Sequence, residues 1–378
     1  MQSEDTRPRS RDIGLRIGTL PTGKQNAITD VAGVMVGQTT LIAGDGPLIP
    51  GHGPVRTGVT VILPHAGNLY RDKVPAAIHI INGFGKCMGQ EQVDELGTLE
   101  SPIALTGTMN VGLVTDAIVA WSIRENPDVG IDASTVNPVV GECSDAWLND
   151  MQGRHVREEH VLAAIASASA GPVAEGTIGA GVGMTAFGYK GGIGTSSRVM
   201  PAHLGGWTVG VLVLANFGRR DQLVIDGVPI GRILAAEDDV PERGSIMMIV
   251  ATDAPLLDRG LRRLARRAGI GLARTGSIAG NGSGDYVIAF SASPSVRIPY
   301  EPLTPTIQVE LMIDTDKPID ALFQATVEAT EEAIVNALFR ATTVVGRDGN
   351  TREALPIERV TELLRAAGRL DNAVEPSQ

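Results

Sequence analysis

A run of apolar residues at positions 246–250 begins directly after a charged loop, and this boundary sets the first constraint on the fold. The loop at 236–242 contains a proline and several acidic residues, so it is predicted to be non-helical and to lie in solvent. The apolar run mixes β-branched and unbranched residues, which is typical of a buried strand. The chain is therefore expected to pass from solvent directly into a sheet.

The residues Gly244 and Ser245 stand at this boundary. A glycine tolerates a distorted backbone, which would let the Ser245 hydroxyl reach the carbonyl group that precedes it. A chain could cut itself at such a position. Glycine and serine are also common in ordinary turns, so a plain turn is the alternative interpretation of these two residues alone.

Length and composition describe a soluble globular protein. The 378 residues can form one large domain or two ordinary ones, and 43% of them are hydrophobic while 20% are charged. The chain has 46 glycines and only 3% aromatic residues, which favours tight turns and close backbone approach over large aromatic clusters.

The net charge of −11 argues against nucleic acid or an anionic membrane as a partner. Four arginines between 262 and 267 are predicted to form the solvated face of a helix. Cys87 and Cys143 are the only cysteines, too few for a disulfide framework or a zinc site. No signal peptide or run of about 18 apolar residues is seen, so we expect a cytoplasmic protein.

Strands and helices are predicted to alternate, which indicates an α/β or α+β fold. The polar segment 1–25 is expected to be an arm that packs on a neighbouring molecule or has no role. Gly269 is expected to end one of the helices. Strands are predicted at 57–64, 208–217 and 286–290, and helices at 111–121, 158–168, 257–268, 323–338 and 360–367.

Glycine is dense between 175 and 194, so a nucleotide-binding loop has to be considered. The dinucleotide fingerprint requires G-x-G-x-x-G, and the sequence 179–184 has methionine at the last position. The phosphate loop G-x-x-x-x-G-K-[ST] is absent from the sequence. We therefore interpret these glycines as places where strands and turns approach closely.

Common hydrolase motifs are also missing: the sequence contains neither G-x-S-x-G nor H-E-x-x-H. His155 and His160 are five residues apart and would fall on different faces of a helix. The other histidines have no carboxylate partner that spacing reveals. No metal or cofactor is predicted, and a nucleophilic serine would use a base other than histidine.

Three polar groups could surround a reactive serine. Residues 281–285 read as a tight loop before a strand, which could aim a hydroxyl and a carboxylate in one direction. Asn216 ends an apolar strand with a side-chain amide, the donor type of an oxyanion site. Glu142 is placed in a turn before Trp147. Each of these features taken singly is also compatible with a structural role.

Together these residues resemble the DmpA/BapA family, which comprises L-aminopeptidase/D-esterase-amidases and β-peptidyl aminopeptidases, self-processing serine hydrolases of peptidase family S58. The resemblance extends from Asn26 to about Arg340. It rests on seven motifs in the family's order, at 26–34, 138–142, 148–156, 175–184, 215–218, 244–246 and 281–285.

The resemblance implies that the chain is cleaved between Gly244 and Ser245 into an α chain, 1–244, and a β chain, 245–378. It also implies a single catalytic domain from residue 26 onward, folded as a four-layer αββα sandwich like that of the ornithine acetyltransferases. Family members assemble as tetramers of αβ units, so a homo-oligomer is expected.

The resemblance further assigns roles to individual residues. Ser245 would be both the new N-terminus and the nucleophile, with Ser283 and Asp285 orienting and activating it. Asn216 would serve the oxyanion site, and Glu142 would bind the free amino group of the substrate. Family members often have threonine after this glutamate. Cys143 stands there instead, and with Ser144 it is expected to shape the pocket.

A serine hydroxyl is a poor nucleophile until a base removes its proton. The α-amine of Ser245, with a reference pKa of about 7.7–8, and the Ser283 hydroxyl are both candidates for that base. Either mechanism requires Ser245 to lie close to Asn216 and to residues 281–285.

We therefore expect an aminopeptidase that hydrolyses short peptides, amides and esters of L-, D-Ala-type or β-amino acids through an acyl-enzyme. One alternative is acyl transfer of the ornithine acetyltransferase type, which uses threonine at the scissile position where this chain has Ser245. The other is a catalytically inactive binding homologue, which the presence of every expected site residue disfavours.

Overall fold

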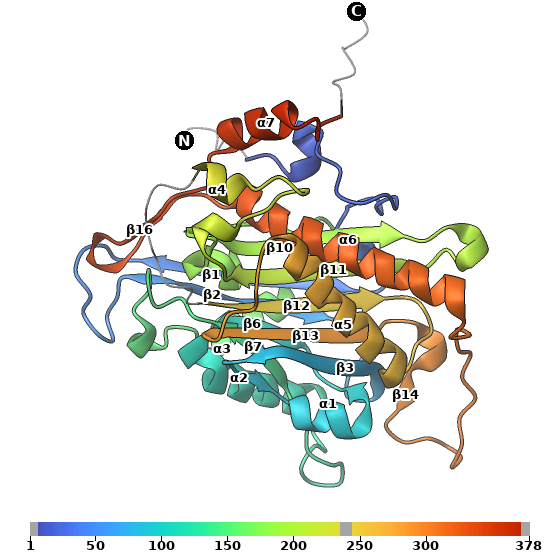
Figure 1. Cartoon of the computed structure of the whole chain (residues 1–378). Helices are drawn as coiled ribbons and strands as arrows, with labels where there is room; N and C mark the ends of the chain where they lie inside the picture. The colour runs from blue at the N-terminus through green and yellow to red at the C-terminus, as the bar shows by residue number, and fades with distance from the viewer. Residues whose placement is uncertain (1–6, 235–243, 372–378) are drawn as a thin grey trace, which may run out of the picture.

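The structure is a computed structural model that describes residues 7–234 and 244–371 (Figure 1). The charged loop predicted at 236–242 lies outside the described residues. Within them, the largest sheet has seven strands: β10 (Gly192–Val199), β11 (Thr208–Asn216), β12 (Gly244–Thr252), β13 (Ser283–Ser291), β3 (Asp72–Gly83) and β14 (Ile298–Pro299) in this order, with β5 (Thr98–Leu99) paired to β3.

A second sheet has five strands in the order β1 (Met35–Ala43), β2 (Val55–Leu63), β6 (Ile103–Gly107), β7 (Val139–Cys143) and β4 (Cys87–Met88). Two small hairpins complete the strands that the structure describes, β8 (Thr185–Ala186) with β9 (Tyr189–Lys190) and β15 (Val344–Val345) with β16 (Thr351–Arg352). The described helices are α1 (Gln90–Leu96), α2 (Val111–Glu125), α3 (Glu158–Ala166), α4 (Ile230–Leu234), α5 (Asp258–Arg274), α6 (Asp316–Arg340) and α7 (Ile357–Ala366).

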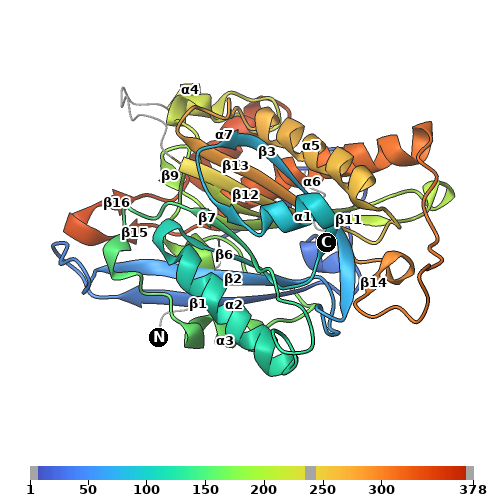
Figure 2. The same cartoon turned by 90° about the horizontal axis from the view of Figure 1, so that it is seen from below.

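Helices cover the outer faces of the two large sheets. Helices α5 and α6 lie on the seven-stranded sheet, and α2 and α3 lie on the five-stranded sheet at the opposite side of the molecule (Figure 2). One apolar cluster fills the space between α5, α6 and their sheet, a second joins the two sheets, and a third lies under α2 and α3. The predicted mixture of helices and strands is confirmed.

Burial of both faces of strand β12 explains why its sequence is continuously apolar. Ile246, Met248 and Val250 belong to the cluster beneath the helices, whereas Met247 and Ile249 belong to the cluster between the sheets. Successive side chains of a strand point to opposite faces, so a strand covered on both faces needs an apolar residue at every position. The strand is buried along its whole length, as the sequence predicted.

Helix α5 runs past Gly269 to Arg274, so the prediction that Gly269 ends this helix is wrong. A Cβ atom on Gly269 would lie 3.1 Å from the side chain of Ile81, and one on Gly271 would lie 2.6 Å from the Val327 carbonyl oxygen of α6. The two glycines therefore let α5 pack closely on β3 and on α6. Packing against these neighbours offsets the low helix propensity of glycine.

The glycines between 175 and 194 serve close packing, in agreement with the sequence-based interpretation. A Cβ atom on Gly194 would lie 2.0 Å from the Ala333 carbonyl oxygen of α6, and one on Gly181 would lie 2.6 Å from the Gly176 carbonyl oxygen. The backbone here approaches other backbone too closely for any side chain.

The described part of the N-terminal segment packs on helix α6 of its own chain, and its packing on a neighbouring molecule stays a prediction. The Ser10 hydroxyl donates to Asn336 Oδ1 at 2.8 Å, and Arg11 Nε lies 2.7 Å from Glu332 Oε1 in α6. Buried polar side chains of α6 account for this attachment because the segment satisfies their hydrogen bonds. Among residues 7–234 and 244–371, no helix is long and apolar enough to cross a membrane.

Candidate active site

Three neighbouring strands bring the predicted residues together at one end of the seven-stranded sheet. Asn216, the last residue of β11, is the register partner of Ser245 in β12, and Ser245 is in turn the partner of Gly284 in β13. Directly opposed residues of adjacent antiparallel strands have side chains on the same face. The structure thus places Ser245 beside Asn216 on one side and beside the 281–285 segment on the other.

The Ser245 hydroxyl is buried where the space between the two sheets ends. The residue is 6% exposed, and Ser245 Oγ accepts a hydrogen bond from the Gly284 backbone N–H at 3.2 Å. Its side chain lies on the face of β12 that also carries Met247, the face toward the five-stranded sheet. A backbone N–H therefore points at the predicted nucleophile.

Gly244 is required for a different reason than the one its position suggested. It lies in the extended strand and is absent from the glycines with positive φ among the described residues. A Cβ atom on Gly244 would instead lie 1.8 Å from the Asn216 carbonyl oxygen. Close backbone approach between β11 and β12, rather than a left-handed backbone, excludes a side chain here.

The Asn216 side chain is fixed at both ends of its amide. Its Oδ1 accepts from the Thr185 backbone N–H at 2.7 Å, and its Nδ2 donates to the Ser144 carbonyl oxygen at 3.0 Å. These bonds distinguish the oxygen from the nitrogen. An amide nitrogen carries two N–H groups, so a second one remains to bind an oxygen atom near Ser245.

Ser283 and Asp285 form a hydrogen-bonded pair, with Ser283 Oγ donating to Asp285 Oδ1 at 2.6 Å. Both residues lie in strand β13, so the prediction that they belong to a loop before the strand is wrong. Alternation along β13 places them on the face of Val287, toward the helices, opposite to the face of Ser245. Ser283 is the register partner of Gly244. The pair is therefore next to the predicted scissile bond rather than to Ser245 Oγ.

Glu142 lies in strand β7, so its predicted position in a turn is also wrong. The adjacent Gly141 explains how β7 reaches the site, since a Cβ atom there would lie 2.3 Å from Met247 Cε in β12. Glu142 Oε1 accepts from the Lys86 backbone N–H at 3.1 Å, and Oε2 accepts from the Thr108 hydroxyl. The carboxylate is thus oriented at a point where the two sheets touch.

The turn between β3 and β4 forms another part of the site. The sequence predicted a turn there but gave no indication that it contacts β13. A Cβ atom on Gly284 would lie 2.7 Å from the Phe84 carbonyl oxygen. The Tyr286 hydroxyl bonds the carbonyl oxygens of Gly83 and Gly85 at 3.2 and 3.0 Å. Asn82 Nδ2 donates to the Gly280 carbonyl oxygen at 3.1 Å and also to that of Ser283.

The residues that follow Glu142 have separate environments. Cys143 is fully buried between the sheets, and burial raises the pKa of its thiol well above the usual value. It therefore influences the pocket only through packing. Ser144 is exposed and contributes its carbonyl group to Asn216. Burial raises the pKa of Asp145 to about 6, although hydrogen bonds from Thr57 and Asn149 lower it.

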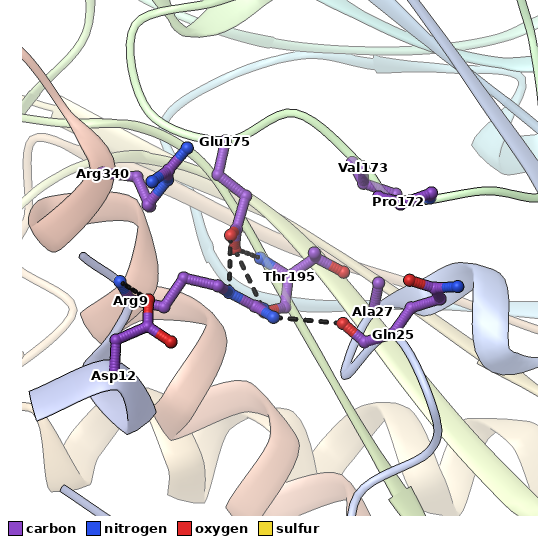
Figure 3. A pocket seen from close by; sticks show the side chains of 9 residues that line it. All are labelled: Arg9, Asp12, Gln25, Ala27, Pro172, Val173, Glu175, Thr195 and Arg340. Atoms are coloured by element: carbon purple, nitrogen blue, oxygen red, sulfur yellow. Dashed lines mark hydrogen bonds and ion pairs between the residues drawn. The ribbon is translucent and has the colours of Figure 1, made fainter. Parts of the chain in front are cut away.

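A polar cavity of about 220 Å³ lies elsewhere, under the N-terminal segment (Figure 3). Burial raises the pKa of Glu175 in its wall to about 7, and Arg9, whose Nε lies 2.7 Å from Glu175 Oε2, opposes that shift. The cavity shares no residue with the site at Ser245. Its lining consists of Arg9, Asp12, Gln25, Ala27, Pro172, Val173, Glu175, Thr195 and Arg340.

The arrangement at Ser245 has the elements of acyl-transfer chemistry: a buried hydroxyl, fixed N–H donors beside it and an oriented carboxylate nearby. Among residues 7–234 and 244–371, no group of three or more His, Cys, Asp or Glu residues could hold a metal ion. Comparison with known proteins adds a decisive observation, because the model of peptidase family S58 matches residues 26–352. The chain belongs to peptidase family S58.

Relatives of known name cover nearly the whole of this S58 peptidase. It is 44% identical over 374 residues to β-peptidyl aminopeptidase BapA of Sphingosinicella xenopeptidilytica, an alignment that covers 95% of this chain and 91% of BapA. The β-aminopeptidase of Burkholderia sp. superposes with a TM-score of 0.87 at 44% identity, over 96% of this chain and 99% of that one.

The L-aminopeptidase D-Ala-esterase/amidase of Ochrobactrum anthropi superposes equally well, with a TM-score of 0.87 at 39% identity over 97% of this chain and all of that one. That protein is described as a prototype of the serine aminopeptidases and a variant of the Ntn hydrolase fold. These findings confirm the predicted family and support aminopeptidase activity in this S58 member.

Proposed function

We propose that this S58 peptidase is a self-processing aminopeptidase in which Ser245 becomes the N-terminal nucleophile. The observation that carries the proposal is the position of Ser245 between Asn216 and the Gly284 N–H. Ser245 is the second residue of the buried strand β12, directly after Gly244, where no side chain fits. Cleavage of the Gly244–Ser245 bond would leave the serine at a fixed chain end.

In the proposed self-cleavage, Ser245 Oγ attacks the Gly244 carbonyl carbon and the Ser245 nitrogen leaves as the new amine. The resulting ester is hydrolysed by water. The pair formed by Ser283 and Asp285 lies opposite Gly244, which suits transfer of the proton to the departing nitrogen. The side-chain alternation therefore favours a role for this pair at the amine rather than at Ser245 Oγ.

In peptide hydrolysis, Ser245 Oγ attacks the carbonyl carbon after its own terminal amine accepts the hydroxyl proton. That proton passes to the leaving amine, and water then hydrolyses the acyl-enzyme. The free N–H of Asn216 donates to the oxyanion, an interaction worth about 3 kcal/mol in comparable sites. Because the other atoms of this amide are already bonded to Thr185 and Ser144, the donor needs no rearrangement.

Glu142 restricts the reaction to substrates with a free amino group. Its side chain is 3% exposed and the Lys86 ammonium stands 3.8 Å from Oε1, so a substrate ammonium would add a closer charged contact to this buried group. An acylated substrate would cover the carboxylate without providing an ammonium group. The cost would be several kcal/mol, comparable to the loss of a hydrogen bond to a charged group. The names of the relatives indicate short peptides, amides and esters of β-, L- or D-Ala-type amino acids as substrates.

We also infer a four-layer αββα sandwich for the domain from residue 26 onward, supported by the three successive apolar clusters. A homo-oligomer of αβ units remains part of the proposal. The segment 303–313 carries apolar side chains that project into solvent, among them the fully exposed Leu303 and Ile313, which is 73% exposed. Burial of these side chains against another subunit would suit such an assembly.

The substitution Ser245→Ala tests the proposal. Mass spectrometry under denaturing conditions should find two fragments, 1–244 and 245–378, in the natural protein and one intact 39.5 kDa chain in the variant. The variant should also lose hydrolysis of amino-acid p-nitroanilides. Ser144→Ala, which removes an exposed neighbouring hydroxyl, should be cleaved and active. An intact and fully active Ser245→Ala protein would refute the proposal.

A further inference from the structure

Glu142 shares its pocket with a cation that the proposed mechanism does not use. Lys86 Nζ lies 3.8 Å from Glu142 Oε1, the same oxygen that accepts the Lys86 backbone N–H. The Glu142 side chain is 3% exposed, whereas that of Lys86 is 55% exposed. A buried carboxylate therefore has an accessible ammonium group at its open side.

The backbone on both sides of Lys86 is fixed. The Gly85 carbonyl oxygen accepts from the Tyr286 hydroxyl at 3.0 Å, and Cys87 is the register partner of Gly141, the residue before Glu142. The flexible part is the lysine side chain alone. Its ammonium can turn away from Glu142 when a better acceptor arrives, while the main chain continues to orient the carboxylate.

A substrate that offers only an ammonium has to share Glu142 with Lys86. Two cations at one carboxylate repel each other, so Lys86 opposes the binding of such a substrate. A substrate that carries an ammonium and a carboxylate on the same carbon offers a partner to both residues. The ammonium would bind Glu142, and the carboxylate would accept hydrogen bonds from Lys86 Nζ.

We propose that Lys86 and Glu142 together bind a zwitterionic head group, and that β-aspartyl peptides and amides are a preferred substrate class. This inference rests on the proposed function. In a β-aspartyl residue the amine is two carbons from the reacting carbonyl carbon, as in any β-amino acid. The amine-bearing carbon also carries a free α-carboxylate, so one residue supplies both charges.

The reaction requires no additional reactant. Ser245 Oγ bonds to the β-carbonyl carbon, the C–N bond breaks, and the departing amine takes the proton that Ser245 lost. Water then cleaves the ester, which releases aspartate and regenerates the serine. Lys86 and Glu142 take no part in bond breaking, so changes in either should act on substrate affinity and selectivity.

The experiment compares two p-nitroanilides, aspartic acid β-p-nitroanilide and β-alanine p-nitroanilide, which differ only by the α-carboxylate. The natural protein should have the higher kcat/KM for the β-aspartyl compound. Lys86→Met should lower that value about tenfold or more, the usual effect of losing a charge-assisted hydrogen bond, and should leave β-alanyl hydrolysis equal or faster. Lys86→Arg should keep the preference.

Lys24→Met removes a surface lysine outside the site and serves as the matched control, which should change neither rate. The proposal is overturned if Lys86→Met leaves the ratio of the two kcat/KM values unchanged. It is also overturned if the natural protein hydrolyses only the β-alanyl compound, a result that would leave the aminopeptidase function intact.

Binding measurements keep the inference testable without turnover. Calorimetry with L-aspartate and with β-alanine should show that Lys86→Met weakens aspartate binding about tenfold and leaves β-alanine binding unchanged or tighter. A natural protein that hydrolyses neither anilide but shows this difference would refute the proposed function alone. Equal aspartate binding by the natural protein and the Lys86→Met variant would refute the zwitterion site.

Discussion

The amide of Asn216 and the hydroxyl of Ser245 face each other across two antiparallel strands, β11 and β12. Strand registry fixes this relationship, because a shift by one residue would turn one of the two side chains to the opposite face of the sheet. Thr185 and Ser144 also hold the amide in its orientation. The pair therefore has a geometry that single substitutions can dissect.

Asn216→Ala is expected to lower kcat about 100-fold to 1,000-fold, because the proposed oxyanion loses a fixed donor. The variant should also unfold more easily, by about 1–3 kcal/mol, since the Thr185 N–H loses its acceptor. Asn216→Asp separates the two effects: it keeps an acceptor for Thr185 but has no N–H. Initial rates per mole of cleaved protein provide the measurement, and an Asn216→Asp variant of natural activity would contradict the donor role.

Gly244→Ala is expected to block self-cleavage and destabilise the protein. The new Cβ atom would lie 1.8 Å from the Asn216 carbonyl oxygen, so the strands must separate, at a cost of about 1–3 kcal/mol. Gly112→Ala is the control, because nothing lies within 4 Å of a Cβ atom at that helical position. Thermal melts and intact masses should show an uncleaved, less stable Gly244→Ala protein, and natural behaviour of that variant would disprove the steric argument.

Tyr286→Phe is expected to raise KM severalfold with a smaller change in kcat. The substitution removes the hydrogen bonds to Gly83 and Gly85 and frees the turn that leads to Lys86, the backbone donor to Glu142. The loss of stability should be about 1 kcal/mol. Tyr300→Phe removes a hydroxyl that also bonds a backbone group, that of Ser134, and should leave KM unchanged. Equal KM values for the two variants would show that the hydrogen bonds of Tyr286 to this turn do not affect substrate binding.

The buried carboxyl group of Asp145 is expected to make the stability of the protein depend on pH. Burial raises the pKa of this carboxyl from 3.8 to about 6, so the folded protein binds its proton more tightly than the unfolded chain does. The contribution of Asp145 to stability is therefore fully present below pH 3.8 and is lost as pH rises through 6. The difference corresponds to about 3 kcal/mol.

Asp145→Asn should remove that dependence. Urea unfolding between pH 4 and pH 7 should show that the free energy of unfolding of the variant rises relative to the natural protein as pH increases. Asp116→Asn changes an exposed aspartate and should follow the natural protein. A constant difference between Asp145→Asn and the natural protein across this range would show that Asp145 does not titrate there.

Local sequence predicted the elements of this fold better than their ends. The apolar run at 246–250 and the helical spacing after residue 257 correspond to β12 and α5, since burial on defined faces leaves a periodic pattern. Gly269 misled the prediction because close packing on Ile81, which lies far away in the sequence, decides its role. Glu142 and Ser283 belong to strands because pairing partners elsewhere in the chain extend those strands beyond their apolar residues.

The proximity of Ser245 and Asn216 could be predicted from the sequence, whereas the groups that orient the Glu142 carboxylate could not. Ser245, Asn216 and Glu142 each stand in a recognisable motif. Lys86 and Thr108 reach Glu142 across 56 and 34 residues, and Asn82 reaches Ser283 across 201 residues. Such contacts depend on the antiparallel pairing of β3 with β13 and on the approach of the two sheets, which no local pattern records.

The strand order has a consequence for the cleaved molecule. Strands β12 and β13, which follow the predicted break, lie between β11 and β3, which precede it. Neither fragment contains the whole seven-stranded sheet, so the two would stay interleaved in it after the bond is cut and could part only by unfolding. Denaturation would then double the number of particles, and the melting temperature of the processed protein should increase with its concentration, as it does for an obligate dimer.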